Sequence, residues 1–237
     1  IFKGSYFTQL DKDVDSLLSQ KGVNWSQKNQ FGIQLKNRIR GKWSKDWHSF
    51  IAAPKISNIE NNNFNEDDTM ELNFVPSVPS LQKGGEDEAL YCLNTFLNSR
   101  HKDYSQKMSS PITAEYSCSR LSPHITFGTI SIKSIVSKIE NNNNENNFEK
   151  KSIYSFKKRL AWHCHFIQKL YDEPKIEFEN LHPLYNNLRS ESFNTSFYKS
   201  WKEGATGFPF LDACLRFLKA KGWLNFRMRA MITSFAS

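Results

Sequence analysis

The sequence predicts a mainly α-helical fold, and three observations lead to this prediction. Apolar residues recur every three or four positions in several segments, which places them on one face of a helix. Tracts rich in polar residues separate these segments. The first residues, by contrast, combine a helix, a glycine and a short strand-like stretch, which is typical of the end of an α/β domain. The segments with helical spacing are Glu86–Leu97, Ile153–Leu170, Pro209–Leu218 and Leu224–Phe235.

The N-terminal part predicts one helix and one short strand. Residues 6–20 place Phe7, Leu10, Val14, Leu17 and Leu18 on a single stripe. Gly22 is a suitable helix terminator, and residues 23–27 are then expected to form a strand. We interpret residues 1–53 as the C-terminal remnant of an α/β domain together with a connector.

Two polar tracts define the remaining boundaries. Residues 54–85 are rich in Pro, Asn, Ser, Asp and Glu without a period, which predicts a linker or a long surface loop. Asn141–Asn147 reads NNNNENN and predicts a loop between two helical regions. Residues 86–237 then form the helical domain. Its last helix reaches Ser237 without a glycine or proline stop signal, so we expect the chain to be a piece of a longer protein.

Composition narrows the class of protein. The formal net charge of +8 favours an anionic partner such as nucleic acid, although charge alone is better explained as general surface charge. No apolar run reaches the roughly 18 residues of a membrane span, and the first residues lack the pattern of a signal peptide. We therefore expect a cytoplasmic protein.

The cysteines and histidines predict no metal site. The four cysteines are widely spaced and contain no Cys-x-x-Cys pair, so reduced thiols are expected. His163 and His165 are two positions apart and therefore point in different directions on a helix.

The helix expected at residues 153–171 has an unusual second face. That face combines basic with aromatic side chains, which suits stacking on bases beside phosphate neutralisation. A second layer of helices covering the aromatic rings is the alternative, and composition does not decide between the two. The face contains Lys158, Arg159, Trp162, His165, Phe166 and Lys169.

Two turns resemble phosphate-binding entries into helices. Residues 117–124 combine three serines with an arginine and a proline, and residues 201–209 contain two glycines and a proline. Hydroxyls and exposed backbone N–H groups at such turns bind phosphate oxygens. Serine and proline also begin helices where no ligand is bound, so each turn alone is weak evidence.

Taken together and in order, four segments resemble the photolyase/cryptochrome family, specifically its helical FAD-binding domain. They read SCSRLSPHITFGTIS, RLAWHCHFIQKL, SWKEGATGFPFLDACLRFL and GWLNFRMR, and the resemblance covers roughly residues 86–237. Residues 1–50 resemble, more weakly, the end of the family's N-terminal α/β antenna domain. The family's Asp-Gly-Asp motif, the residue facing flavin N5 and two inner tryptophans correspond to positions beyond Ser237.

The resemblance implies a set of FAD-binding residues. In the family a tyrosine contacts the FAD phosphates, a Thr-Ser-Arg-Leu-Ser turn binds them, and a tryptophan and an arginine lie near the cofactor. Cys118 replaces the threonine of that turn, which weakens one hydroxyl contact. The implied residues are Tyr104, Cys118, Ser119, Arg120, Leu121, Ser122, Trp223 and Arg229.

The resemblance also implies catalytic and DNA-contacting residues. Trp162 corresponds to the tryptophan that stacks on a flipped-out pyrimidine dimer, and Trp201 to the outermost tryptophan of the electron-transfer chain. Arg159 takes the place of a glutamate that contacts the dimer in repair enzymes. Phe226 replaces an asparagine or histidine, and Met108 replaces a DNA-contacting arginine. The implied DNA-binding set is Arg159, Trp162, His163, Phe226 and Arg227.

Three functions follow from the resemblance. In the first, reduced FAD absorbs blue light and donates an electron to a pyrimidine dimer, making the protein a DNA-repair lyase that acts on dimer-containing DNA as a monomer. In the second, the protein is a cryptochrome photoreceptor without repair activity, which the arginine at position 159 favours. In the third, a helical fragment binds DNA without the cofactor. The sequence leaves the photoproduct and the antenna pigment open.

Overall fold

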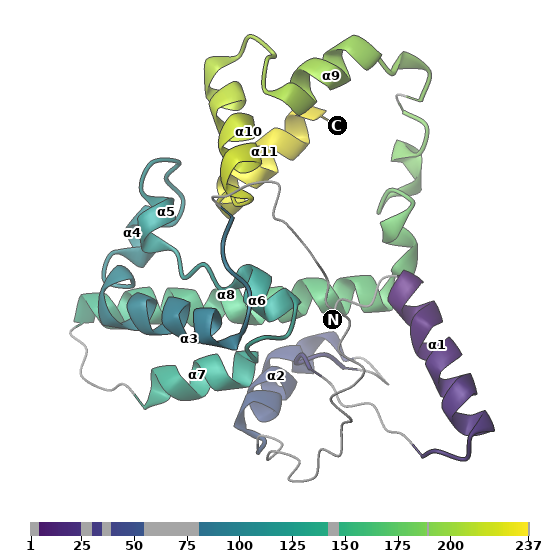
Figure 1. Cartoon of the computed structure of the whole chain (residues 1–237), viewed down its shortest axis with the longest axis vertical. Helices are drawn as coiled ribbons and strands as arrows, with labels where there is room; N and C mark the ends of the chain where they lie inside the picture. The colour runs from purple at the N-terminus through teal and green to yellow at the C-terminus, as the bar shows by residue number, and fades with distance from the viewer. Residues whose placement is uncertain are drawn as a thin grey trace, which may run out of the picture.

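The computed structural model describes residues 5–24, 30–34, 39–54, 81–141, 147–188 and 190–236. Within these ranges the chain is helical and contains no strand (Figure 1). The α-helices are α1 (Ser5–Gln20), α2 (Trp43–Ala52), α3 (Glu86–Thr95), α4 (Tyr104–Lys107), α5 (Ala114–Ser117), α6 (Ser122–Thr126), α7 (Ile132–Glu140), α8 (Asn147–Asp172), α9 (Thr195–Glu203), α10 (Pro209–Lys221) and α11 (Phe226–Ala236). A π-helical turn, Phe96–Arg100, continues α3, and short 3₁₀ turns lie at Arg40–Lys42, Pro174–Glu177, Pro183–Tyr185 and Ser190–Ser192.

The long helix α8 organises the larger of two hydrophobic clusters, and α3, α6 and α7 lie along it (Figure 1). Phe96 is fully buried at the centre of this cluster. Its ring centre lies 4.6 Å from that of Phe156 on α8 and 5.5 Å from that of Tyr104 on α4. Aromatic contacts at these distances add to the free energy gained by burial. We call this part of the molecule the large lobe.

The connector before α2 packs into the same cluster through α8. Gln168, fully buried, accepts a hydrogen bond from the Gln34 backbone N–H at 2.5 Å and donates one to the Gln34 carbonyl at 3.1 Å. Trp47 of α2 is buried in the same cluster. Because one side chain satisfies both backbone groups of Gln34, this part of the connector is fixed to α8.

The second cluster is smaller and belongs to α9, α10 and α11, which we call the small lobe. The Asn194 side chain caps α9 by accepting from the Phe197 N–H at 3.0 Å, and Gly204 ends that helix with φ 67°. Asp212 of α10 accepts hydrogen bonds from Thr206 and from the Gly207 N–H at 3.0 Å, which orders the loop between α9 and α10. Hydrogen bonds between residues close in sequence therefore fix the start of α9 and the loop between α9 and α10.

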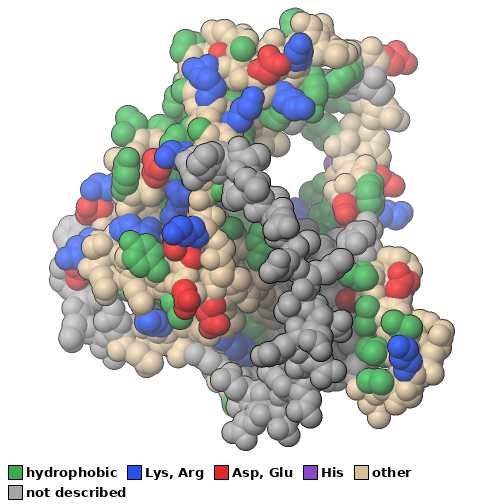
Figure 2. Space-filling view, viewed as in Figure 1, with side chains coloured by type: hydrophobic (Ala, Val, Ile, Leu, Met, Phe, Trp, Pro, Cys, Tyr) green, Lys and Arg blue, Asp and Glu red, His purple; other side chains and the backbone are tan. Residues whose placement is uncertain are grey.

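Several predictions of local structure are confirmed, and others need correction. The helix at 6–20 forms as α1, but its stripe is not covered: Leu10 is 43% and Leu17 52% exposed, and hydrophobic side chains are visible along this helix in Figure 2. Val23, the start of the expected strand, is irregular, and the strand's last three positions lie outside the described residues. Asn147, assigned to a loop, begins α8. Most of the tract at 54–85 also lies outside the described residues.

No helix in the described ranges is long and apolar enough to cross a membrane. The described residues also contain no group of three or more potential metal ligands.

Candidate functional site

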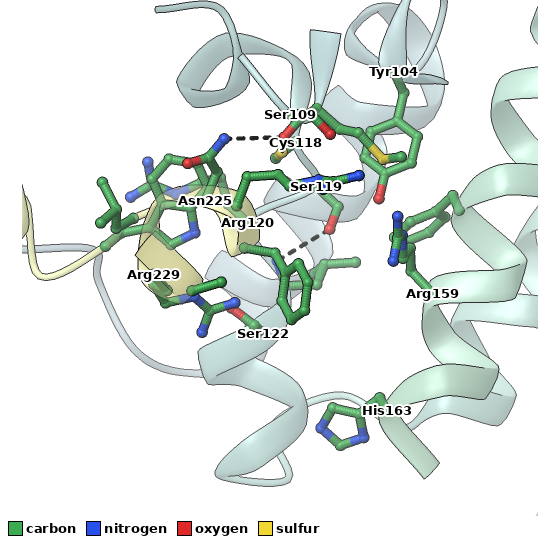
Figure 3. Close-up of a pocket in the computed structure, with 18 of the residues that line it drawn as sticks. Tyr104, Ser109, Cys118, Ser119, Arg120, Ser122, Arg159, His163, Asn225 and Arg229 are labelled. Carbon is green, nitrogen blue, oxygen red and sulfur yellow. Dashed lines mark hydrogen bonds between the residues drawn. The ribbon is translucent and has the colours of Figure 1, made fainter. Parts of the chain in front are cut away.

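A cavity of about 670 Å³ lies between the two lobes. One wall is the turn at residues 118–122, a second is α8, and the third is α11 (Figure 3). This volume lies within the range of about 300–1,000 Å³ that is typical of small-molecule sites. The site is therefore assembled from segments more than one hundred residues apart in sequence.

Arg100 holds the turn at residues 118–122 from behind. Its guanidinium donates to the carbonyl of Cys118, to that of Ser119 at 3.4 Å and to that of Cys92 at 2.7 Å. Burial lowers the pKa of Arg100, and the neighbouring arginine at position 120 adds to this effect. One guanidinium thus links two carbonyls of the turn to one carbonyl of α3.

Arg120 occupies an unusual backbone conformation within this turn. Its φ of 63° lies in the left-handed region, where residues with a Cβ are uncommon. Gln82 stabilises that conformation, because its amide donates to the Arg120 carbonyl at 2.8 Å and also contacts His124 Nε2 at 2.9 Å. The Arg120 guanidinium stacks 4.4 Å from the ring centre of Trp223. Arg120 is therefore fixed at both its backbone and its side chain.

Asn225 joins α11 to the large lobe. It is buried, and its amide donates to the carbonyls of Met108 at 3.2 Å and Ser110 at 3.3 Å. This contact brings Phe226 and Arg229 of α11 to the wall of the cavity. The position of α11 at the site thus depends on hydrogen bonds that span more than one hundred residues.

The wall formed by α8 contributes Arg159 and His163, one turn apart. The Tyr104 hydroxyl points toward the Arg159 guanidinium across the cavity (Figure 3). The same guanidinium lies 6.0 Å from the ring centre of Phe226 on α11. Arg159 therefore stands where the two lobes approach each other.

The electrostatic character of the cavity is cationic. Its lining contains four arginines and no aspartate or glutamate among the described residues. Burial raises the pKa of the Cys118 thiol to about 11 and raises the pKa of the Tyr104 hydroxyl, so both stay neutral near pH 7. Such a lining favours a ligand with negative charge. The four arginines are Arg120, Arg159, Arg227 and Arg229.

Two buried polar atoms of the lining have no hydrogen-bond partner within the protein. They are His163 Nδ1 and Asn225 Oδ1. Burial lowers the pKa of His163, so its imidazole is neutral near pH 7. Because unsatisfied buried polar atoms are costly, they are candidate contacts for a ligand.

The structure brings most of the residues implied by the resemblance to one cavity. Met108, where the family often has arginine, also lines it. Those implied residues that line the cavity are Tyr104, Cys118, Ser119, Arg120, Leu121, Ser122, Arg159, His163, Trp223, Phe226, Arg227 and Arg229.

Two implied residues lie outside the cavity. Trp162 is 52% exposed on α8, with its ring 5.8 Å from that of Phe166, which does line the cavity. Neither of these two rings is buried by the described residues, whereas His165 on the same face lies against Trp43 of α2, with the ring centres 5.4 Å apart. Trp201 packs against the small lobe's core instead, and its Nε1 donates to the Ile232 carbonyl at 3.1 Å.

Sequence reasoning missed the role of Arg100, Gln82 and Asn225 in holding the site; Asn225 lies within GWLNFRMR, whereas the other two lie outside the quoted segments. Arg100 is 18 positions from the carbonyl of Cys118, and Gln82 is 38 positions from Arg120. Gln82 also stands in the tract that the sequence assigns to a linker. Nothing in the local pattern distinguishes Arg100 or Gln82 from polar residues of the surface.

Comparison with known proteins gives the family. Residues 156–237 match the model of the FAD binding domain of DNA photolyase. The chain belongs to the photolyase/cryptochrome family. It is 31% identical to a deoxyribodipyrimidine photo-lyase of Streptomyces griseus over 159 residues, covering 66% of this chain and 32% of that relative. It is 28% identical to Cryptochrome-1 of Arabidopsis thaliana, over 60% of this chain and 21% of that relative.

The fold agrees with this family. An archaeal photolyase from Sulfolobus tokodaii, solved with two FAD molecules, superimposes with a TM-score of 0.73 at 22% identity. The alignment covers 98% of this chain and 51% of that structure. This chain therefore spans about half of that structure and, in the Streptomyces and Arabidopsis relatives, a third of the length or less.

FAD is the cofactor of this type of domain, and the cavity of this photolyase/cryptochrome chain suits it. Its volume is that of a small-molecule site, and its arginines and serine hydroxyls suit the two phosphates of the dinucleotide. The two unpartnered polar atoms supply one acceptor, Asn225 Oδ1, and a donor or acceptor, His163 Nδ1. The residues present therefore fit the group.

Proposed function

We propose that this chain forms part of a light-driven DNA-repair lyase that binds FAD in the cavity between the lobes and acts on pyrimidine dimers. The observation that carries the proposal is one cavity that joins the turn at residues 118–122, four arginines and Phe166 on an exposed aromatic face of α8. The Streptomyces relative, a deoxyribodipyrimidine photo-lyase, supports the choice of reaction.

In this proposal the turn at residues 118–122 holds the phosphates of FAD. Arg120 and Arg229 neutralise their charge, while the hydroxyls of Ser119 and Ser122 supply neutral hydrogen bonds. Arg100 and Gln82 keep the turn in position without touching the ligand. The carbonyls of Cys118 and Arg120 are already engaged, so they do not need water as a partner.

When bound, reduced FAD would supply the electron on absorption of blue light, and the part of this chain would be to position the acceptor. Trp162 and Phe166 offer stacking surfaces at the edge of the cavity for a base that has left the duplex. Arg159 and Arg227 attract the phosphates beside it. Arg159 is a donor only, so in the repair reaction it serves the carbonyl oxygens of a pyrimidine and not its N–H groups.

A second candidate function is a cryptochrome-type photoreceptor. It is favoured by the cation at position 159, next to Phe226, where the resemblance implies a carboxylate in repair enzymes. The similarity to Cryptochrome-1 of Arabidopsis thaliana also supports it. This candidate uses the same cavity for FAD and predicts photoreduction without dimer binding.

The first test is the absorption spectrum of the purified chain after incubation with FAD and removal of the excess. A retained, structured flavin band is expected, and Arg120→Gln should lower retention at least tenfold because a charged phosphate partner is lost. Lys219→Gln, a change of equal charge on the exposed side of α10, is the control and should retain FAD.

Absence of the flavin band in the chain and also in a version extended with the rest of the domain would overturn the proposal. If FAD is retained, illumination of dimer-containing DNA distinguishes the two candidates. Restoration of the bases supports the lyase, whereas photoreduction without restoration supports the photoreceptor.

A further inference from the structure

Two side chains from different lobes meet at the rim of the cavity. Arg159 belongs to α8 and Phe226 to α11, and the Arg159 guanidinium lies 6.0 Å from the centre of the Phe226 ring. Both side chains line the cavity, and both are exposed, Phe226 to 53%. A base that enters the cavity on this side therefore meets a guanidinium beside an apolar ring.

The N–H donors of Arg159 are not engaged by a carboxylate. No acidic side chain forms an ion pair with Arg159 in the described part of the chain. The described lining of the cavity also contains no aspartate or glutamate. The Tyr104 hydroxyl, a neutral group, points toward the guanidinium (Figure 3). Arg159 therefore presents its charged donors to a ligand.

The rim formed by this pair offers donors and no side-chain acceptor. Arg159 donates only, and Phe226 has no polar atom. A base edge that turned an N–H group toward this pair would leave that N–H without a partner, which costs free energy. The pair therefore favours a base edge made of acceptors.

The geometry of a guanidinium makes this preference specific. Its two parallel N–H groups fit two adjacent acceptors, as in the bidentate contacts that arginine makes with bases. A thymine-type ring carries an N–H at N3 between its two carbonyls, so it presents no adjacent pair of acceptors. A ring whose N3 carries no hydrogen presents N3 and the C2 carbonyl oxygen side by side and can receive both donors.

We infer that Arg159, beside Phe226, selects a pyrimidine photoproduct whose N3 is an acceptor next to the C2 carbonyl; this inference rests on the proposed function and names the substrate class of its site. Two photoproducts share this chemistry. One is a cyclobutane dimer that contains cytosine, and the other is an adduct in which one ring has become a pyrimidone. A dimer of two thymines lacks it in both rings.

The test is the affinity of the chain, incubated with FAD and kept in the dark, for single strands that each carry one defined photoproduct. Fluorescence anisotropy compares the thymine dimer, the cytosine-containing dimer, the pyrimidone adduct and the undamaged strand. We expect at least one of the two photoproducts with an acceptor N3 to bind about tenfold tighter than the thymine dimer, because a bidentate contact is gained. The tighter of these two identifies the source of the acceptor pair.

The variant Arg159→Glu should reverse this preference by about tenfold. Its carboxylate accepts from the thymine N3–H and repels the lone pair of an acceptor N3. The matched control is Arg227→Glu, which makes the same change of charge in the lining of the cavity, on α11. It should weaken all four strands by a similar factor and leave the preference in place.

Equal affinity for the three photoproducts, or no measurable binding of any of them, would overturn the inference. So would an Arg159→Glu variant that weakens every strand by the same factor as Arg227→Glu, because Arg159 would then contact phosphate alone. The retained flavin band, measured on the same samples, separates this result from the proposed function. A chain that holds FAD but shows no preference counts against the inference alone. A chain that shows the preference but holds no FAD counts against the proposed function and leaves the selection by Arg159 standing.

Discussion

The two lobes that enclose the cavity differ in how they are stabilised. The large lobe buries a cluster that extends from Phe31 of the connector to Ile167 of α8, whereas the small lobe buries five residues of α10, α11 and the loop between them. The small lobe relies more on polar caps such as Asp212. The cavity therefore has one rigid wall and one wall whose position depends on a few contacts.

Because the small lobe has few contacts with the large one, those few contacts determine how the cavity is closed on that side. The small lobe reaches the large one at the cavity through Asn225, through Trp223 stacked against Arg120, and through Phe226 beside Arg159. A ligand that touches both walls adds further contacts between the lobes. Binding of FAD should consequently stabilise the lobe arrangement more than either lobe alone.

The largest expected effect is a loss of stability that differs between the two hydrophobic clusters. Phe96→Ala should lower the free energy of unfolding by about 3–5 kcal/mol, because it leaves a cavity in a core that cannot collapse around it. Leu211→Ala, in the smaller cluster, should cost about 2–3 kcal/mol, near the low end of the usual range, because that cluster can relax. Urea unfolding followed by circular dichroism measures both; equal losses would contradict the distinction.

The second largest loss of stability is expected at Asn225, whose hydrogen bonds form the bridge between the lobes. Asn225→Asp replaces two donors with carboxylate oxygens that face the carbonyls of Met108 and Ser110, which should cost about 1–3 kcal/mol. The melting temperature should fall, and the rise in melting temperature on adding FAD should shrink. Asn194→Asp, which keeps an acceptor at the α9 cap, is the control. An unchanged FAD-induced shift would mean that the bridge does not position α11.

A smaller effect is expected within the small lobe. Trp201→Phe removes the hydrogen bond to the Ile232 carbonyl but keeps an aromatic ring, so the loss should be about 1 kcal/mol. Retention of FAD should be unchanged, because Trp201 does not line the cavity. The electron-transfer role implied by the resemblance predicts, in addition, slower photoreduction of bound flavin in this variant. Photoreduction at the normal rate would remove that role.

The smallest effect is in the pH dependence, and it differs between the lobes. Burial lowers the pKa of His163 below its ordinary value of 6.5, so the unfolded chain binds the proton more readily. The large lobe should therefore lose stability as the pH falls below about 6.5, and His163→Gln should weaken this dependence.

In the small lobe, hydrogen bonds, first that from the Thr206 hydroxyl, lower the pKa of Asp212 below 3.8. The stability that Asp212 contributes is present above that pH and is lost as the pH falls below it. Thermal unfolding between pH 3 and pH 7, with His163→Gln and Asp212→Asn as the two variants, measures both dependences. A loss below pH 6.5 that persists undiminished in His163→Gln would assign it to another group.

The five helices with an apolar stripe, α1, α3, α8, α10 and α11, could be predicted from the sequence, because helical spacing is local. The apolar residues of α8 and the proline and glycine that bound α10 are examples, and the observed bounds extend the expected ones by only a few residues. The expected strand after Gly22 is different. Val23 and Asn24 are the described part of that stretch and form no strand; a strand exists only when it pairs with another, and the described residues contain none.

The residues of the site also divide into those that the local sequence indicates and those that only tertiary contacts reveal. Motif resemblance alone was enough to name Arg120, Arg159 and Arg229 as candidates, since their neighbours in sequence belong to recognisable segments. The sequence could not show that Arg100, Gln82 and Asn225 hold those segments together. Their partners are backbone carbonyls, and any residue presents a carbonyl, so no side-chain pattern marks the pairing.

By itself, then, the sequence determined the helical class, the basic charge and the aromatic–basic face of α8, all of which depend on residues close together in the chain. Only the tertiary structure decided that Trp162 and Phe166 on this face are exposed, that Trp201 packs in the small lobe and that four arginines share one cavity. The physical reason is that burial and the approach of charges depend on contacts between distant segments. Those contacts arise when the whole chain packs, and no local pattern encodes them.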